Sequence, residues 1–396
     1  MELENQYIYL DHAATTPLDP AVLAAMTPYF SAAFFNPSSS YGPAKTNKKA
    51  LETARATCAA ILGVQPGEII FTSGGSESDN LALKGVLEGF ANFGKPRRHI
   101  ITTPVEHHAI LNPVAHLAEQ GYEVTYLPVD GAGRVNPQDL EAAIRPDTAL
   151  VSIIAANNEI GTIQPLAELG EITRRHKVPF HTDGVQAAGM LELNLAELKV
   201  DLFSLSAHKF YGPRGVGLLY VRRGIPFASQ ILGGEQERNR RAGTENLPGI
   251  IGLAIALRLA YQDHAATTAR LTGLRDRLIR GVLEQVPGAV LTGATGAERL
   301  PNHASFCFEG VFGETILLEL EQAGILCSSG SACAAGSNEP SHVLLALGFD
   351  EDLARTAVRF TLGRETTQAE IDRVLAVLPG IITDLQNLDN RVEAVL

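Results

Sequence analysis

Two residues of the sequence have the side chains needed to hold and use a pyridine cofactor. Asp183, in HTDGVQ, stands at the carboxyl end of an apolar run, and Lys209, in SAHKFYGP, follows the next such run. A carboxylate can keep a pyridine nitrogen protonated, and a lysine of lowered pKa can form an imine, as pyridoxal phosphate (PLP) chemistry requires. Taken singly, Asp183 could instead cap the following helix, and Lys209 could be a solvated surface residue.

A turn rich in glycine and serine, TSGGSES, runs over residues 72–78 between a predicted strand and a predicted helix. Glycines let backbone N–H groups approach an anion, and a helix N-terminus favours negative charge, so the turn is a candidate phosphate site. Ser206 and His208 could donate to the same phosphate. The alternative is an ordinary strand-to-helix turn with a serine cap. The turn matches neither the Walker pattern nor G-x-G-x-x-G, so it indicates neither a nucleoside triphosphate nor a dinucleotide.

Polar residues in three other stretches could contact the cofactor or its substrate. In PVEHHAIL, one imidazole of His107 and His108 could stack on a ring or move a proton, while the other caps the helix or faces solvent. In AANNEIGT, Asn157 and Asn158 could donate to a ligand oxygen or form a turn. Arg359 lies within the strand-like run AVRFTLG, where its guanidinium would suit a substrate carboxylate unless it lies on an exposed face.

Cys333 stands in SSGSACAAG, residues 328–336, among small residues that offer no apolar packing. Glycines and small side chains predict mobility around residues 330–340. With only Cys58, Cys307 and Cys327 besides it in 396 residues, no disulfide framework is expected, which favours a reducing, cytoplasmic setting. The spacing of Cys and His also indicates no structural metal.

The elements that must position these residues alternate between strand and helix patterns from about residue 50 to 221. The strand-like runs are 68–73, 99–104, 123–129, 149–158, 178–183, 201–206 and 215–221. Several are continuously apolar, which is typical of an α/β fold whose mostly parallel seven-stranded sheet is covered on both faces. In such sheets the carboxyl ends of the strands face the ligand crevice, so Asp183 is expected there.

The pattern changes from about residue 252. An amphipathic stretch over 253–286 predicts one long helix, and short strands follow in HASFCFEG and AVRFTLG. A closing helix starts after Thr366–Thr367, which are expected to cap it. We expect a large domain over 16–255 and a smaller α+β domain over 256–396 that is completed by residues 1–15.

Composition excludes several classes of function. The net charge is −12 with no long basic run, which argues against a nucleic-acid partner. No apolar stretch reaches about 18 residues, and no signal peptide is visible, so no membrane association is expected.

Taken in order, the motifs resemble the cysteine desulfurases of the class-V aminotransferase family, which have PLP fold type I. The resemblance extends from YLDHAATTP (8–17) through FNPSSSYG (35–42), NNEIGTIQP (157–165), HTDGVQ and SAHKFYGPRGVG to SGSACAAGSNEPSHVLLALG (329–348). The S-G-S-A-C segment is similar to the NifS/IscS branch, since the SufS branch carries R-x-G-x-H-C. Gly75–Ser76 departs from the family's frequent Ala-Thr or Gly-Thr but keeps the hydroxyl.

The resemblance implies the catalytic roles. Lys209 would bind PLP and act as the natural base, Asp183 would pair with the ring nitrogen, and His107 would stack on the ring and assist proton transfer. Cys333 would accept the sulfur of L-cysteine as a persulfide while L-alanine is released. No metal is expected in the PLP site, and an iron–sulfur cluster would meet Cys333 only during sulfur transfer.

The resemblance also implies the binding residues and partners. The phenolic oxygen would contact Asn158 and Gln186, and the phosphate would contact Gly75, Ser76, Ser206 and His208. Thr244, in RRAGTEN, would reach the phosphate of a partner subunit, so a homodimer is expected. Arg359, with Asn36 and Asn158, would hold the substrate carboxylate. The sulfur would pass to an acceptor such as an iron–sulfur scaffold protein, for cluster or other sulfur-dependent biosynthesis.

Two other functions fit part of the sequence. A PLP-dependent aminotransferase of the same fold would share Lys209, Asp183 and Arg359, but it has no use for Cys333 in its small-residue segment. A non-catalytic scaffold of a sulfur pathway would bind no cofactor or would not respond to cysteine, and the intact Lys209, Asp183 and Cys333 argue against it.

Overall fold

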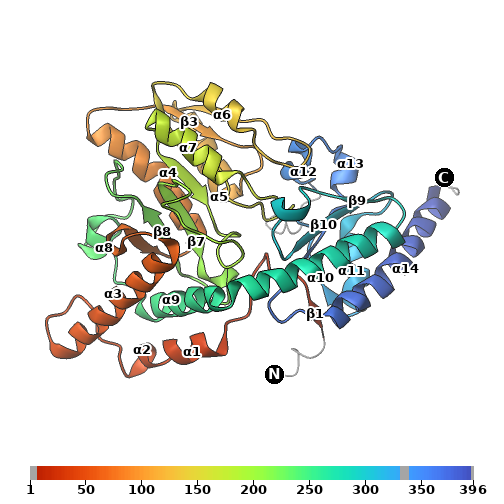
Figure 1. Ribbon diagram of the computed structural model, residues 1–396, viewed down its shortest axis with the longest axis horizontal. Coiled ribbons are helices and arrows are strands. Elements are labelled where there is room, and N and C mark those ends of the chain that lie inside the picture. The colour runs from red at the N-terminus through yellow and green to blue at the C-terminus, as the bar shows by residue number, and fades with distance from the viewer. Residues whose placement is uncertain (1–6, 331–338, 394–396) are drawn as a thin grey trace.

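The computed structural model describes residues 7–330 and 339–393. A seven-stranded sheet lies at the centre of its larger part, on the left in Figure 1, in the order β2-β8-β7-β6-β5-β3-β4. The strands are β2 (Ile69–Thr72), β3 (His99–Thr102), β4 (Glu123–Tyr126), β5 (Thr148–Ser152), β6 (Phe180–Asp183), β7 (Leu202–Ser206) and β8 (Gly217–Val221). Neighbouring strands are parallel except where β8 pairs with β2 and β7. The predicted mostly parallel sheet of seven strands is therefore confirmed.

Six of the strands are fully buried because helices cover both faces of the sheet, whereas the residues of the edge strand β4 are exposed or half-buried. Phe71 and Phe203 pack in one hydrophobic core with α3 (Gly42–Leu62), α7 (Leu166–His176) and α9 (Leu247–Gln262). Their neighbours Ile70 and Leu202 pack in a second core with α4 (Gly75–Asn92) and α5 (His108–Glu119). Successive residues of a strand point to opposite faces, so burial on both sides requires apolar residues at every position.

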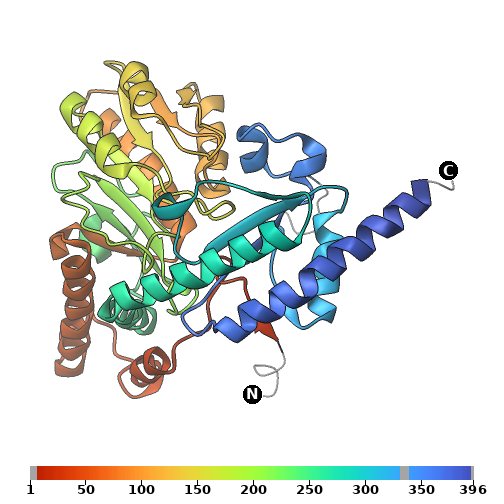
Figure 2. The ribbon, with the colours of Figure 1, turned by 45° about the vertical axis from the view of Figure 1, so that its right-hand side comes forward.

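A smaller antiparallel sheet in the order β12-β10-β9 lies on the other side of the molecule. It consists of β9 (Ala289–Leu291), β10 (His303–Phe308) and β12 (Val358–Thr361). Together with α10 (His264–Gln285), α11 (Gly313–Gln322) and α14 (Gln368–Glu393) it encloses a separate hydrophobic core. In Figures 1 and 2, α10 and α14 lie side by side along this core. The N-terminal strand β1 (Ile8–Tyr9) pairs with β11 (Ile325–Leu326), so residues from both ends of the chain build this part.

The remaining elements are short. They are α1 (Pro20–Met26), α2 (Pro28–Ser31), α6 (Pro137–Ala143), α8 (Gln236–Asn239), α12 (His342–Ala346), α13 (Glu351–Ala354) and the 3₁₀ turns η1 (Pro66–Glu68), η2 (Ala207–Lys209) and η3 (Gly296–Glu298). The helices of the described residues include none that is long and apolar enough to cross a membrane. The expected domain boundaries at residues 16 and 256 stay a prediction.

The C-terminal helices correct one prediction and confirm another. The single helix expected over 253–286 is interrupted at Asp263, whose φ of −122° and ψ of 35° leave the helical region. The interruption separates Leu257, which packs in a core of the larger sheet, from Leu271, which packs in the core of the smaller one. The cap expected at Thr366–Thr367 is confirmed at Thr367, whose hydroxyl and backbone N–H both bond Glu370 in a capping box.

Candidate active site

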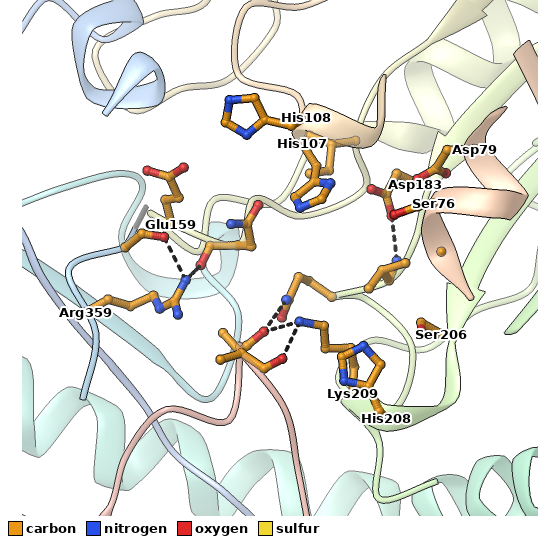
Figure 3. A pocket seen from close by; sticks show the side chains of 18 of the residues that line it. Ser76, Asp79, His107, His108, Glu159, Asp183, Ser206, His208, Lys209 and Arg359 are labelled. Carbon is orange, nitrogen blue, oxygen red and sulfur yellow. Dashed lines mark hydrogen bonds between the residues drawn. The ribbon is translucent and has the colours of Figure 1, made fainter. Parts of the chain in front are cut away.

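A cavity of about 370 Å³ lies between the two sheets, beyond the carboxyl ends of β5, β6 and β7. Residues from distant parts of the chain line it, and Figure 3 shows their side chains arranged around an open centre. Ten of the residues predicted from the sequence are among them: Gly75, Ser76, His107, Asn158, Asp183, Gln186, Ser206, His208, Lys209 and Arg359. The fold therefore collects most of the candidate residues at the edge of the sheet where a parallel α/β fold binds ligands.

Asp183 ends β6, and its side chain is almost fully buried. One carboxylate oxygen accepts a hydrogen bond from the N–H of Val185 at 2.9 Å. Burial raises the pKa of Asp183, while the nearby His107 and Lys209 lower it. A buried carboxylate of this kind gains most from a cationic partner, and a protonated pyridine nitrogen is such a partner.

Lys209 projects from the turn after β7 toward the N-terminal segment. Its Nζ donates to the carbonyl oxygens of Ala13 and Ala14, at 2.8 Å from the latter, and the side-chain amide of Gln186 donates to Ala13 at 2.9 Å. Sequence reasoning missed these two carbonyl groups, because small apolar residues carry no functional side chain. The signal was present only in the motif YLDHAATTP.

The glycine-serine turn leads directly into α4. Gly74 has a φ of +153°, and α4 begins at Gly75, where a Cβ would lie 2.8 Å from a methyl group of Val185. Glycine is therefore required at the start of the helix, whose first turn leaves N–H groups without helical acceptors. Ser76 and Ser206 line the same region as this turn.

His208 completes this cluster as a neutral side chain. Burial and the charge of Lys209 lower its pKa to about 4. One ring nitrogen, Nδ1, lies 3.1 Å from the hydroxyl of Thr15, and Arg214 lines the same depression. A neutral imidazole can donate one hydrogen bond to an anion, so the charge in this region comes from Arg214 and the helix N-terminus.

His107 and His108 differ in role. His107 is the N-cap of α5, with its Nδ1 accepting from the N–H of Ala109 at 3.1 Å, and it also lines the cavity. One of the two histidines was expected to cap the helix, and His107 was expected to contact the cofactor ring. His107 takes the capping role, which is compatible with its place in the cavity wall. Because Nδ1 is an acceptor, the neutral ring carries its proton on Nε2. His108 is exposed and makes an edge contact with His342, the ring centres 4.7 Å apart.

Asn157 and Asn158 also divide two expected roles. Asn157 is fully buried and shapes the turn: its amide donates to Val105, and its oxygen accepts from Glu159 at 2.8 Å and Ile160 at 3.0 Å. Asn158 lines the cavity. The turn formed by the first asparagine thus presents the second to a ligand.

Arg359 is only 2% exposed, so the alternative of an exposed strand face is wrong. Its Nη1 donates to the carbonyl oxygens of Asn158 at 2.9 Å and Gly330 at 3.1 Å, and its Nη2 bonds the carboxylate of Asp11 at 2.8 Å. Its Nε is buried and has no hydrogen-bond partner among the residues that the structure describes. A guanidinium that lines a cavity wall is suited to an anionic ligand group such as a carboxylate.

Two buried acids near Asp183 were missed from the sequence. Burial raises the pKa of Glu106 to about 8 and that of Asp79 well above its usual value, and the charge of Asp183 adds to both effects. Asp79 lies in α4 with one carboxylate oxygen unpaired and 3.6 Å from His181. For Asp183, by contrast, the nearby His107 and Lys209 lower the pKa against the effect of burial. An acid on the buried face of a helix gives no sequence signal of its own.

Two predicted residues, Thr244 and Asn36, do not line the cavity, and a third, Cys333, lies outside the described residues. Thr244 is exposed beside a small depression that Ser73 and Gly215 also line. Asn36 is exposed, and its side chain accepts from the N–H of Ser38 at 2.9 Å. Cys333 and the mobility predicted around it fall largely on residues outside the described ranges. Over residues 7–330 and 339–393, no three His, Cys, Asp or Glu side chains are placed to hold a metal ion.

The side chains present fit PLP. Asp183 suits a ring nitrogen, Lys209 lies across the cavity from it, and the start of α4 with its glycine and serine suits a phosphate (Figure 3). The guanidinium of Arg359 lines the cavity and suits the carboxylate of an amino acid. When bound, PLP supplies an electron sink for negative charge that develops at the α carbon of an amino-acid substrate.

Comparison with known proteins agrees with this geometry. The family model "Aminotransferase class-V" matches residues 8–374. "Cysteine desulfurase IscS" of Methanosarcina thermophila is 49% identical over 97% of this chain and 94% of its own length. A solved NifS-like protein superposes with a TM-score of 0.89 and 38% identity over 96% of this chain and 100% of the other. SspA, solved in complex with cysteine, superposes with a TM-score of 0.79 and 36% identity over 91% of this chain and 99% of its own. The chain therefore belongs to the class-V aminotransferase family and, within it, to the PLP-dependent cysteine desulfurases of fold type I.

Proposed function

We propose that this protein converts L-cysteine to L-alanine and transfers the sulfur to Cys333 as a persulfide, for iron–sulfur cluster or other sulfur-dependent biosynthesis. The observation that carries the proposal is one cavity lined by Lys209, Asp183 and Arg359. Lys209 matches the aldehyde of PLP, Asp183 matches its ring nitrogen, and Arg359 matches the carboxylate of the substrate. The relatives named cysteine desulfurase and the cysteine complex of SspA support L-cysteine as the substrate.

The residues around the cavity divide the work of binding and proton transfer. Arg359 holds the carboxylate of L-cysteine, and the side chains of Asn158 and Gln186 contact the phenolic oxygen of the cofactor. Lys209 takes the proton from the α carbon with its Nζ. Its side chain lines the cavity and supplies an amine opposite Asp183, on the other side of the space that the ring would fill. His107, whose Nδ1 is used by the helix cap, moves a proton through Nε2 at the substrate sulfur or at Cys333.

The location of the other cysteines supports Cys333 as the sulfur acceptor. Burial raises the pKa of the thiols of Cys58 and Cys307 to about 12 and also raises that of Cys327, and none of the three lines the cavity. A thiol must ionise to attack sulfur, so these three are poor nucleophiles at neutral pH. The Cys333 thiolate forms a bond to the substrate sulfur, the Cβ–S bond breaks, and the carbon skeleton leaves as L-alanine. Gly330, three residues before Cys333, lines the cavity.

The assembly we propose is a cytoplasmic homodimer in which Thr244 contacts the cofactor phosphate bound by the partner subunit. Two observations support it: Thr244 is exposed, and it lies outside the cavity of its own chain. Asn36 assists Arg359 at the substrate carboxylate. The persulfide on Cys333 passes to an acceptor such as an iron–sulfur scaffold protein, and a cluster contacts Cys333 only during that transfer.

The experiment is to incubate the PLP-loaded protein with L-cysteine, with and without a thiol reductant. With reductant, we expect sulfide and alanine in equal amounts. Without reductant, mass spectrometry should find one added sulfur on the peptide that contains Cys333. Cys333→Ala should lose both signals, and the matched control Cys327→Ala should keep them.

Four results would contradict the proposal. Sulfur found on Cys327, or full sulfide release by Cys333→Ala, would exclude the assigned acceptor. Amino transfer to a keto acid without sulfide would indicate an aminotransferase. A cofactor absorbance that does not respond to L-cysteine would indicate a non-catalytic scaffold.

A further inference from the structure

The backbone carbonyl of Asn158 receives hydrogen bonds from two different parts of the smaller sheet. Arg359 Nη1, from β12, donates to it at 2.9 Å, and the Nε2 of His303, the first residue of β10, lies 3.1 Å away. His303 is fully buried and does not line the cavity. Since β10 and β12 are paired neighbours, the same sheet holds both donors against one acceptor.

The chemistry of this contact fixes the state of the imidazole. A carbonyl oxygen only accepts hydrogen bonds, so the Nε2 of His303 must carry a proton. Its Nδ1 is buried, and no residue that the structure describes offers it a hydrogen-bond partner. Burial and the charges of Arg299 and Arg359 hold the pKa of His303 well below its usual value, so the ring stays neutral. His303 is therefore a fixed hydrogen-bond donor and not a proton carrier.

The ring also sets the position of the turn that carries Asn158. A Cβ on Gly161 would lie 2.7 Å from Cγ of His303, so the backbone of the turn rests directly on the imidazole. Gly161 has a φ of +74°, and its carbonyl accepts from the N–H of Leu300, just before β10. The turn is thus held by β10 and by the residues just before it. They donate hydrogen bonds to the carbonyls of Asn158 and Gly161, and His303 packs against the backbone of the turn.

We infer that His303 is a positioning residue for the substrate carboxylate site. Its Nε2–H holds the Asn158 peptide in the orientation that also receives Arg359, so one hydrogen bond orients both the guanidinium and the Asn158 side chain. This inference rests on the proposed function, because it takes the ligand of Arg359 to be the α-carboxylate of an amino acid. Without the donor, the Asn158 carbonyl keeps a single hydrogen bond, and one of the three acceptors that orient the guanidinium is no longer held in place.

The test compares His303→Leu with His303→Gln in the PLP-loaded protein. L-Alanine, the expected product, and ethylamine, which lacks the carboxylate, are titrated while the absorbance of the bound cofactor is followed. We expect His303→Leu to raise the dissociation constant of L-alanine about tenfold and to leave that of ethylamine unchanged. His303→Gln, whose amide reaches the same position as Nε2, should remain close to the wild type. The KM for L-cysteine should rise with the L-alanine constant, while kcat stays nearly constant.

Two further variants separate positioning from a general loss of structure. In His303→Asn the side chain is polar but too short to reach Asn158. This variant should therefore raise the dissociation constant of L-alanine as His303→Leu is expected to, and it replaces the leucine variant in the test if that variant folds poorly. His99→Leu removes another fully buried histidine, one bonded to Thr148 and Thr125 at the amino end of β3, away from the cavity. It should lower stability without changing L-alanine binding.

Some results would overturn the inference. They are an unchanged L-alanine constant in His303→Leu, an equal loss in His303→Gln, or an equal loss of ethylamine binding. The proposed function fails separately, through a wild type that binds L-alanine but releases no sulfide from L-cysteine.

Discussion

Replacing Arg359 by lysine should weaken the binding of amino acids through their carboxylate. The guanidinium lines the cavity and uses its terminal nitrogens on Asn158, Gly330 and Asp11. Lysine keeps the charge but has no planar fork, so it cannot satisfy these acceptors and a substrate carboxylate together. Losing one charge-assisted hydrogen bond costs about 1.5–3 kcal/mol, which corresponds to about a 10- to 150-fold higher dissociation constant.

The assay is the titration of the bound cofactor with L-alanine and with ethylamine. The ratio of the two dissociation constants isolates the carboxylate contribution, since cofactor loading and amine reactivity affect both ligands. In Arg359→Lys the dissociation constant of L-alanine divided by that of ethylamine should rise by the factor given above. If both constants rise equally and the ratio is unchanged, Arg359 does not bind the carboxylate.

A double variant connects this prediction with His303. If His303 acts through Arg359, then His303→Leu should add little to the loss already caused by Arg359→Lys. Fully additive effects would show that the two residues act independently.

Two further predictions concern stability. The raised pKa of Glu106, about 8 against the usual 4.5, means that the folded state binds this proton more tightly than the unfolded state. The stabilisation that this proton gives the folded state is complete below about pH 4.5 and is lost as the pH rises through about 8. Between these pH values, the urea midpoint of Glu106→Gln should therefore fall less than that of the wild type. Equal falls in the two proteins would contradict this. Arg55 and Glu237 form a two-bond ion pair, at 2.6 and 2.9 Å, that is almost fully buried, so Arg55→Met should lower the free energy of unfolding by about 3–5 kcal/mol. The exposed ion pair of Arg277 with Asp372 offers the control, since Arg277→Met should lower the free energy of unfolding by less than about 1 kcal/mol. Equal losses of unfolding free energy in the two variants would refute the argument.

The sequence predicted the elements whose signals are local. Most of the seven strands follow from largely apolar runs, and the placement of Asp183 at the end of β6 follows from where its run stops. The cap at Thr367 depends on a residue three positions away and was equally readable. These features depend on neighbours in the chain, and the periodicity of strands and helices is visible in the sequence itself.

Other parts of the site could not be predicted because they depend on contacts between distant segments. Nothing near Lys209 in the sequence indicates that its Nζ would meet Ala13 and Ala14. The amphipathic pattern over 253–286 is continuous, and the helix is interrupted only because its two halves enter different cores.

Arg359 and His303 show most clearly what each level decided. The residue types alone indicated an arginine suited to a carboxylate, but its burial required the smaller sheet to pack against the turn at Asn158. That turn and the sheet are more than a hundred residues apart in the chain, so no local pattern could join them. The sequence by itself determined which chemical groups are present and on which elements, whereas the tertiary structure decided which groups meet, because hydrogen bonding, burial and charge depend on distances that only the folded chain sets.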